Sequence, residues 1–445
     1  MSRMPNVRLA LLLEAVGWGP SRFARALRKL ADERGLPVSC HPTTVRRWLE
    51  GTQPRPVVAA LILECLSDQL GQRITAQEAG LTRAPATVVD PSWEADPVHK
   101  LIQLTRSELD PDRRILLGTG AISLAAPLPP DGVALPRPPL LQAHPSRLRR
   151  RPEPTEADQM RAMASVFAAM ADQYGGQRVR AALAAYLAHD VTPLLRAGGS
   201  DRVQRDILSA TAQLSLLLGN TCADSDHQTA AQHYHQIAVR LAAEADDHTV
   251  LAIALRTMAT HAHDLGNHSP AVLNLAEQAV HHARHATPVT HAYARAQLAV
   301  LQAHHDRHAA MRAYALAERL HSRGGTTPGP FTAYPPGALL FQRAHMLATL
   351  GDLGGTVAAL TTSLRLRTPA ERRAATLTRA RLAESLLRLG HLDQALTHWH
   401  GFLEAFPTLH SAQAARRLGA MRQLLRPHLR HRPAADLLAQ VDGLA

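Results

Sequence analysis

The chain has 445 residues, of which 46 % are hydrophobic but only 4 % aromatic, and its formal net charge at pH 7 is +12. This length allows two or three domains with ample cores, and the abundance of Ala, Leu and Arg favours helices. Val and Ile seldom alternate with polar residues, so strands have almost no support. We therefore predict an all-α protein whose positive charge suits an acidic partner such as nucleic acid.

The cysteines and the apolar runs indicate a cellular compartment. Cys40, Cys65 and Cys222 are isolated in the sequence, which argues against a disulfide framework and favours a reducing environment. The apolar run at residues 9–16 is short and amphipathic, unlike a signal peptide. The run at residues 113–126 is shorter than the roughly 20 residues that span a bilayer. We expect a cytoplasmic protein that does not associate with membranes.

Residues 41–56 combine helix signals with two adjacent arginines. The hydroxyls of Thr43 and Thr44 can accept hydrogen bonds from the free N–H groups of a first helical turn, so we expect these residues to cap and open a helix. Val45, Trp48 and Leu49 recur at the spacing of one helix face, which predicts that this face is buried. We expect the Trp48 indole to pack in the core.

The opposite face of this short helix carries Arg46 and Arg47. Gly51 is expected to end the helix, and two prolines keep the following chain extended around Arg55. A brief helix with two outward arginines and an Arg-bearing turn after it suits the major groove of DNA.

Residues 1–84 hold further short helices around this one. Apolar spacing predicts helices at residues 9–16, 21–31, 58–70 and 74–81, with Ser21 capping the second. The order of the helices and the Trp-Leu-Glu-Gly-x-x-Pro-Arg sequence resemble the lambda-repressor-like helix-turn-helix family. The same residues contain 12 Arg or Lys against 7 Asp or Glu, a surplus that suits phosphate contacts.

The resemblance implies that residues 1–84 form a domain that binds double-stranded DNA. The third helix of this domain would contact base edges or phosphates. The expected DNA-binding residues are Thr43, Thr44, Arg46, Arg47, Arg55, Ser21 and Arg22. In the alternative interpretation, these arginines form the solvated face of a helical protein-interaction domain.

Residues 85–154 are predicted to connect two domains. Residues 96–109 and 113–126 have helical patterns, and the prolines that follow exclude regular structure and stiffen the chain. Four arginines between positions 147 and 151 belong to a solvated linker or touch DNA outside the groove. We place the boundary of the next domain near Glu153.

Residues 155–445 contain a repeated pair of helices, clearest at residues 376–407. A Leu-Ala face, a Leu-Gly-x-x-Asp turn and a second apolar face with Trp399 and Phe402 precede Pro407. This order resembles the tetratricopeptide repeat. Weaker copies have turns at positions 266, 306 and 351, and the clearest copy has its turn at 390. Successive turns in this series are 40, 45 and 39 residues apart. Earlier pairs are predicted at residues 160–195 and 208–243.

About six such pairs would form an α-solenoid whose concave face is built from the first helix of each pair. By resemblance to the repeat family, this face binds a peptide or protein ligand. The outward positions of the first helices give the expected ligand-binding residues Gln213, Arg256, Thr260, His263, Val300, His304, Phe341, His345, Glu384 and Arg388. In the alternative interpretation, they form a solvated polar face.

The 26 histidines raise the question of a metal site. His281 with His285, and His304 with His308, stand four residues apart on predicted helices, so each pair could hold one ion. Neither pair has an obvious third ligand in sequence, so we assign no metal and no cofactor. No phosphate-binding Gly-rich loop, nucleophile elbow or His-Glu-x-x-His motif occurs, and we expect no enzymatic activity.

The combination of a repressor-like domain with a tetratricopeptide solenoid resembles transcription regulators of differentiation and secondary metabolism in high-GC filamentous bacteria. It is also similar, more distantly, to the peptide-receptor regulators of quorum sensing. The resemblance implies a homodimer that binds DNA half-sites and responds to a peptide or protein. The main alternative is a scaffold protein whose solenoid docks a partner and whose first domain has lost DNA binding. A third interpretation is a metal-dependent enzyme.

Overall fold

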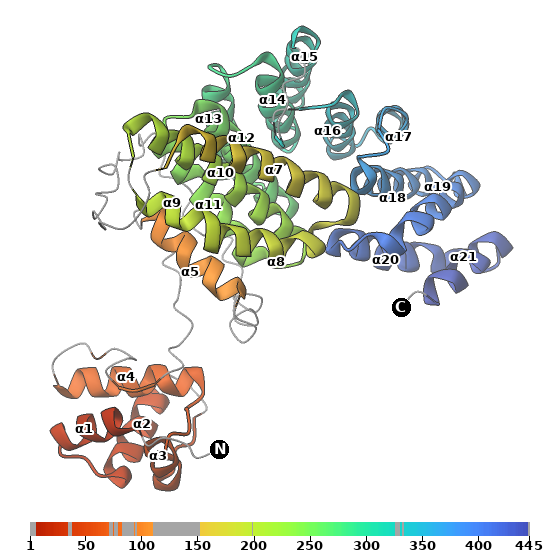
Figure 1. Ribbon diagram of the computed structural model, residues 1–445. Coiled ribbons are helices and arrows are strands. Elements are labelled where there is room, and N and C mark those ends of the chain that lie inside the picture. Colours follow the sequence, from red (N-terminus) through yellow and green to blue (C-terminus); the bar gives the residue numbers. More distant parts are fainter. Residues whose placement is uncertain are drawn as a thin grey trace. The chain divides into compact units, whose positions relative to one another are not determined.

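The computed structural model describes residues 6–33, 38–70, 74, 79–81, 93, 96–109, 152–197, 199–324, 330–331 and 333–443. It divides into two compact units, Met1–Val89 and Asp90–Ala445. We call the first unit the head and the second the solenoid. Every regular element in the described ranges is a helix, so the predicted all-α class is confirmed (Figure 1). The predicted helix at 113–126, the proline-rich linker and most of residues 74–81 lie outside these ranges.

The head packs four helices around one apolar core. They are α1 (Val7–Ala15), α2 (Pro20–Glu33), α3 (Pro42–Leu49) and α4 (Pro56–Leu70). Phe23, Val45 and Trp48 are buried together in this core, as the apolar spacing predicts. Because Trp48 is only 5 % exposed, its indole anchors α3 to the core of the head and is unavailable for stacking on a base.

The predicted starts of two of these helices were wrong. Helix α3 begins at Pro42 with His41 as its N-cap, so Thr43 and Thr44 lie inside the first turn and do not cap it. Likewise, α2 begins at Pro20, one residue before Ser21. The reason is the same in both, because proline presets a helical φ and lacks only an N–H that the first turn leaves unpaired anyway.

The end of α3 follows the prediction. Gly51 has a φ of +94°, a conformation that costs glycine little. Its N–H donates to the Trp48 carbonyl (3.1 Å) and the Thr52 N–H donates to the Arg47 carbonyl (2.9 Å). These two bonds satisfy the last carbonyls of α3 and turn the chain toward α4.

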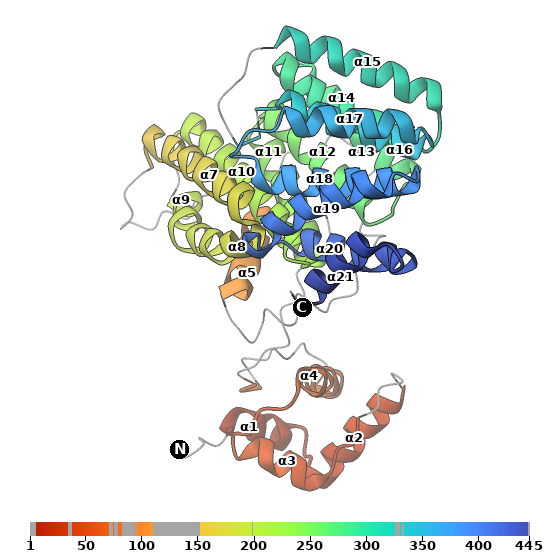
Figure 2. The ribbon, with the colours of Figure 1, turned by 90° about the vertical axis from the view of Figure 1, so that its right-hand side faces the viewer.

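The solenoid consists of helices packed largely in successive pairs (Figures 1 and 2). Its first helices are α5 (Pro97–Leu109), α7 (Pro154–Tyr174), α8 (Gly176–Tyr186) and α9 (Thr192–Ala197), with a π-helical turn at Leu187–Val191 between the last two. The pairs are α10 (Asp201–Asp224) with α11 (Gln228–Glu244), α12 (His248–Asp264) with α13 (Pro270–Ala283), α14 (Pro288–Gln302) with α15 (Arg307–Arg323), α16 (Pro336–Thr349) with α17 (Leu353–Arg365), and α18 (Arg372–Arg388) with α19 (Leu392–Ala405). A shorter pair, α20 (Ala412–Leu425) and α21 (Arg432–Asp442), follows, and single 3₁₀ turns at Phe406–Thr408 and Arg426–His428 precede its two helices.

Three of the predicted repeat turns have the same backbone geometry. Gly266, Gly351 and Gly390 have φ values of +85°, +80° and +85°. In each turn the glycine N–H and the following N–H donate to carbonyls of the preceding helix, at 2.9 to 3.2 Å. A glycine in the left-handed region lets the chain reverse in a few residues. The repeated glycine therefore explains why successive helices form hairpins.

The pair at residues 376–407 has the packing that its sequence predicts. Ala383 and Ala395 are fully buried, and their small side chains let α18 and α19 approach closely. The Trp399 and Phe402 rings are also fully buried and meet edge to face, 5.7 Å apart. They belong to a core that continues into α20 and α21, so each pair buries its apolar face only with the help of the next.

The two ends of the solenoid meet. Helix α18 packs against α7, and the His410 N–H donates to the Tyr174 carbonyl (2.8 Å). Gly175 lies at this contact with a φ of +90°, and a Cβ there would come within 2.3 Å of the His410 carbonyl oxygen. Figure 2 shows α7 and α8 beside α18 and α20. The first helices of the pairs therefore enclose an interior instead of lining an open groove.

Helix α5 belongs to this unit, where it packs against α8 and α11. Within the described residues, no helix is both long and apolar enough to cross a membrane.

Candidate functional site

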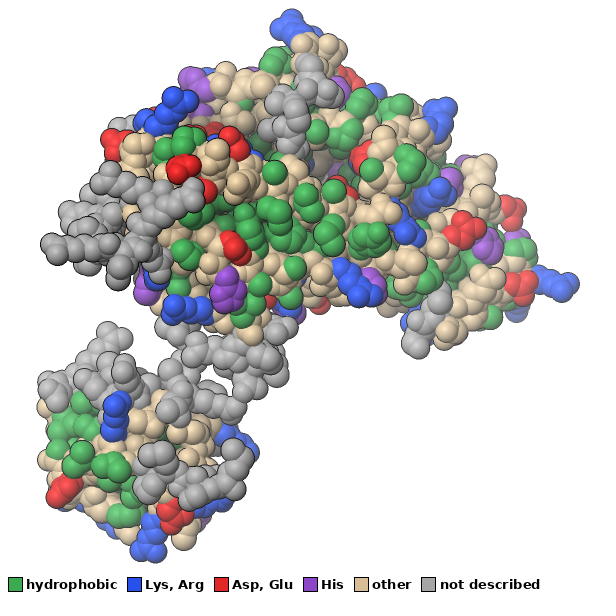
Figure 3. All heavy atoms as spheres, viewed as in Figure 1, with side chains coloured by type: hydrophobic (Ala, Val, Ile, Leu, Met, Phe, Trp, Pro, Cys, Tyr) green, Lys and Arg blue, Asp and Glu red, His purple; other side chains and the backbone are tan. Residues whose placement is uncertain are grey.

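The exposed face of α3 carries the residues that the sequence selects for DNA contact. Thr43, Arg46 and Arg47 stand three and four residues apart on one helix face and are all exposed, while Thr44 is half-buried. Within the described residues, neither arginine forms an ion pair. Arg55 is exposed in the turn that follows. The predicted juxtaposition is therefore present, and Figure 3 shows Lys and Arg side chains at several places on the head surface.

Asn6 fixes the position of α3. Its backbone N–H donates to the Leu49 carbonyl (2.8 Å) at the end of α3. Its side-chain oxygen accepts from the Leu9 N–H (3.1 Å) as the N-cap of α1. Its amide donates to the Ala79 and Gly80 carbonyls (3.1 and 2.9 Å). The backbone and side chain of this one residue thus join three segments, a role that local periodicity does not reveal.

Helix α2 adds a second basic face. Ser21 and Arg22 are exposed, and the Arg22 guanidinium lies 5.8 Å from the centre of the Trp18 ring. Arg25 follows three residues after Arg22 and is also exposed. Arg25 was not among the predicted residues, although its spacing from Arg22 on a predicted helix places both on one face.

The interior of the solenoid contains two adjoining cavities, of about 340 and 150 Å³. They share Thr260, Asp264, Arg373 and Gln413 as lining residues. Most of the lining comes from α10, α12, α14, α16 and α18, with contributions from α7 and α20. First helices therefore face inward, as the repeat pattern predicts.

Half of the predicted ligand-binding residues line these cavities. They are Arg256, Thr260, His263, Phe341 and His345. The other five do not belong to either lining. Glu384 binds Arg417 (3.0 Å), Gln213 is half-buried, and Arg388 and His304 are exposed.

The prediction for Val300 was wrong. Its side chain is 1 % exposed in the core that α14 shares with α15 and α16, because the helix register at this position turns it away from the interior.

Asp224 holds the two ends of the solenoid together from inside. Its carboxylate is 4 % exposed and accepts from the Gly176 N–H (2.9 Å), the Ser411 hydroxyl (2.6 Å) and two nitrogens of Arg373 (2.8 and 3.0 Å). Burial disfavours the Arg373 charge, but this carboxylate outweighs burial and raises the pKa of the guanidinium. The donors come from α8, α18 and the residue before α20, so one carboxylate bridges the first and last repeats.

The smaller cavity has an excess of positive charge. Arg367, Arg373 and Arg417 each bind a carboxylate. Arg381 packs against the Phe341 ring (5.7 Å) and has no ion pair within the described residues. Burial and the neighbouring Arg417 lower the pKa of Arg381 to about 10, although the nearby Asp264 and Glu384 oppose this change, so Arg381 remains charged at neutral pH.

The same cavity exposes polar atoms that lack partners. The side-chain amide nitrogen of Gln297, the amide oxygen of Gln342, Nε2 of His345 and Nε of Arg367 are buried without a hydrogen bond to any described residue. Buried donors and acceptors are normally paired. These atoms therefore require water or a bound polar group.

A comparison with protein families supports a distinct domain in the head. A family model described as the SP15 N-terminal domain matches residues 9–82, which include α2 to α4 and all of α1 except its first two residues. No curated protein matches the chain.

Proposed function

We propose that the protein is a DNA-binding transcription regulator whose solenoid binds a peptide or protein ligand. The observation that carries the proposal is the geometry of α3. Arg46 and Arg47 are exposed beside Thr43, while Val45 and Trp48 fix the opposite face in the core. A helix presented in this way can enter a major groove, where arginines form bidentate hydrogen bonds with guanine.

The interior of the solenoid is the proposed ligand site. The lining of its smaller cavity has four arginines but one acid, Asp264, and it also has unpaired polar atoms. Both features favour an acidic ligand, such as a peptide segment whose carboxylate reaches Arg381. Such a ligand shifts DNA binding only if its affinity differs between the DNA-competent and incompetent states. We propose that the solenoid also forms the dimer interface. The two heads of such a dimer would bind paired DNA half-sites.

The test is DNA binding by the full chain. DNA fragments enriched from a random pool provide a selected site, and fluorescence anisotropy gives the affinity for it. We expect Arg46→Ala with Arg47→Ala to weaken selective binding on the order of 100-fold, because each specific arginine contact contributes about 1–3 kcal/mol. Wild-type affinity should also fall steeply with salt.

The matched control removes two charges elsewhere. Arg312 and Arg319 are exposed on α15 in the solenoid, and Arg312→Ala with Arg319→Ala should leave DNA binding unchanged. Selective binding that survives the α3 substitutions would contradict the proposal and favour the scaffold interpretation, in which only the solenoid has a partner.

A further inference from the structure

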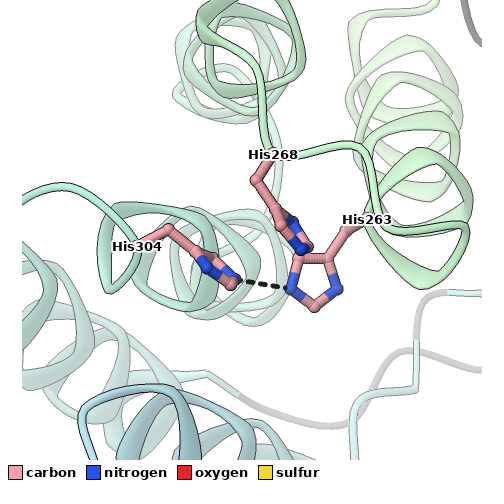
Figure 4. Close-up of side chains that lie close together, drawn as sticks. All are labelled: His263, His268 and His304. Atoms are coloured by element: carbon pink, nitrogen blue, oxygen red, sulfur yellow. Dashed lines mark hydrogen bonds between the residues drawn. The ribbon is translucent and has the colours of Figure 1, made fainter.

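Three histidines from separate turns meet at one point of the solenoid. His263 lies near the end of α12, His268 in the loop before α13 and His304 just after α14. Each can offer one ring nitrogen such that all three nitrogens lie within 4.8 Å of one another. Figure 4 shows the three rings converging, with His263 Nε2 and His304 Nε2 3.0 Å apart.

The repeat architecture explains this convergence. His263 and His304 are 41 residues apart, almost the spacing of the predicted turns at 266 and 306, so they occupy the same end of successive pairs. Gly266 reverses the chain with its positive φ and returns His268 to the same place. The sequence pairs at spacing four, such as His304 with His308, therefore do not coincide with this group.

The surroundings prepare the three rings for a cation. His263 Nδ1 lies 3.5 Å from the Asp264 carboxylate, an arrangement that orients the ring and directs Nε2 toward His304, as carboxylates do behind metal-binding histidines. His305 contacts the His268 carbonyl oxygen through Nε2 (3.0 Å) and so fixes the loop that carries His268.

We propose that His263, His268 and His304 form a site for a divalent transition-metal ion, with Zn²⁺ as the best fit. Two imidazole nitrogens on tetrahedral zinc at about 2.0–2.1 Å are roughly 3.3 Å apart, close to the 3.0 Å between His263 and His304. The stacked His268 and His304 rings, 3.9 Å apart, would rotate about χ2 to direct their lone pairs to the ion. The fourth position would remain open, since His304 is exposed.

Such an ion would join two consecutive repeats. It would connect the α12–α13 turn to the α14–α15 turn beside the smaller cavity, which His263 lines. Imidazole ligands favour zinc, copper and nickel over magnesium and calcium, so Mg²⁺ should not replace Zn²⁺ at this site. The proposal does not depend on DNA binding.

The experiment measures metal binding by the full chain after treatment with a chelator. Calorimetry with ZnCl₂ and with MgCl₂ gives affinity and stoichiometry, and thermal unfolding shows whether the ion stabilises the folded state. We expect one Zn²⁺ site per chain that His304→Gln and His263→Gln each weaken at least tenfold. Zinc should raise the unfolding temperature of the wild type but raise it less in these variants.

The matched controls use histidines outside the cluster. His308→Gln, four residues after His304, and His282→Gln, in the other group of neighbouring histidines, should retain the wild-type Zn²⁺ affinity of this site. Equal zinc affinity in the His304→Gln variant and the wild type would overturn the proposal, as would loss of the site in His282→Gln alone. Far-UV circular dichroism at about room temperature verifies that each variant is folded.

Discussion

The head and the solenoid use arginine in opposite ways. Every arginine that the structure describes in the head is exposed, including Arg46 and Arg47 on α3. Inside the solenoid, Arg373, Arg417 and Arg367 are each bound to a carboxylate of the same unit. The described arginines of the head therefore face solvent, whereas these three arginines of the solenoid are paired within their own unit.

The contrast teaches where stability depends on charge. An exposed arginine can be removed from the head at little cost to folding, because exposed charges contribute little. An acid that binds a buried cation in the solenoid cannot be removed so easily, because the cation would remain without a partner. Three substitutions or conditions make this difference measurable.

The largest effect is expected for Asp224→Asn. The substitution removes the charge that Arg373 faces and weakens acceptance from Gly176 and Ser411. Breaking a buried ion pair costs about 3–5 kcal/mol, and we expect a loss near 3 kcal/mol because the Arg373 side chain is 26 % exposed. Urea unfolding followed by circular dichroism measures the change.

Asp226→Asn is the control for this variant. The Asp226 carboxylate binds Arg416 at 2.7 Å, but both side chains are more than half exposed. Asp226 also has a φ of +65°, which asparagine tolerates well. We expect a change below about 1 kcal/mol, and equal losses in the two variants would remove the distinction between interior and surface charges.

An intermediate effect is expected for Asn6→Ala in the head. The change removes an N-cap and leaves the Ala79 and Gly80 carbonyls without their donor. We expect a loss of about 2 kcal/mol from the cap and the unpaired groups. Hydrogen exchange of α1 and α3 peptides in the full chain would report this loss. Exchange in α12 and α14 should stay unchanged.

Asn6→Asp tests the two contributions separately. Aspartate keeps the acceptor for the Leu9 N–H but loses the amide donor. It should therefore retain part of the protection of α1. If both variants exchange like the wild type, the side-chain bonds of Asn6 do not stabilise the head.

The smallest effect is a pH dependence confined to the solenoid. Burial lowers the pKa of His235 well below its usual value and that of His282 to about 4. Protons then bind the unfolded chain more readily as pH falls from about 6.5, so stability decreases on acidification. The head contains a single histidine, His41, and should change less.

Two acids oppose this trend. Burial raises the pKa of Glu244 to about 7 and also raises that of Asp172, so protonation of these groups favours the folded state. More histidines shift downward than acids shift upward, and we expect a net decrease in the unfolding temperature of the solenoid between pH 6.5 and 5, a window near the usual histidine pKa of about 6.5. A stable or rising temperature over this window would contradict the assignment.

Local sequence patterns predicted the elements of this fold well. The glycines at 266, 351 and 390 identified the turns, and the apolar spacing of Val45 and Trp48 identified the buried side of α3. The patterns failed at the starts of α2 and α3, where proline at the first helical position replaced the expected hydroxyl caps. These features depend on residues close together in the chain.

The sites depended on contacts that sequence spacing does not contain. Arg373 meets Asp224 across 149 positions, and His263 meets His304 across 41. The first contact results from small rotations accumulated over successive pairs, whereas the second joins the corresponding turns of two adjacent pairs. The helix register that turns Val300 into the core is a similar case, because a shift of one residue moves a side chain by about 100° around the helix.

The contact between Asp224 and the segment that begins α20 changes how this repeat array should fold. In an open array, terminal repeats can be deleted one at a time, since each contacts only its neighbours. Here Ser411 contacts Asp224 at the end of α10, and His410 contacts Tyr174 at the end of α7, so a segment that is synthesised late completes an early part of the structure. We expect a chain truncated before Ser411 to lose cooperativity throughout the solenoid, and nascent chains to remain sensitive to protease until this segment has left the ribosome.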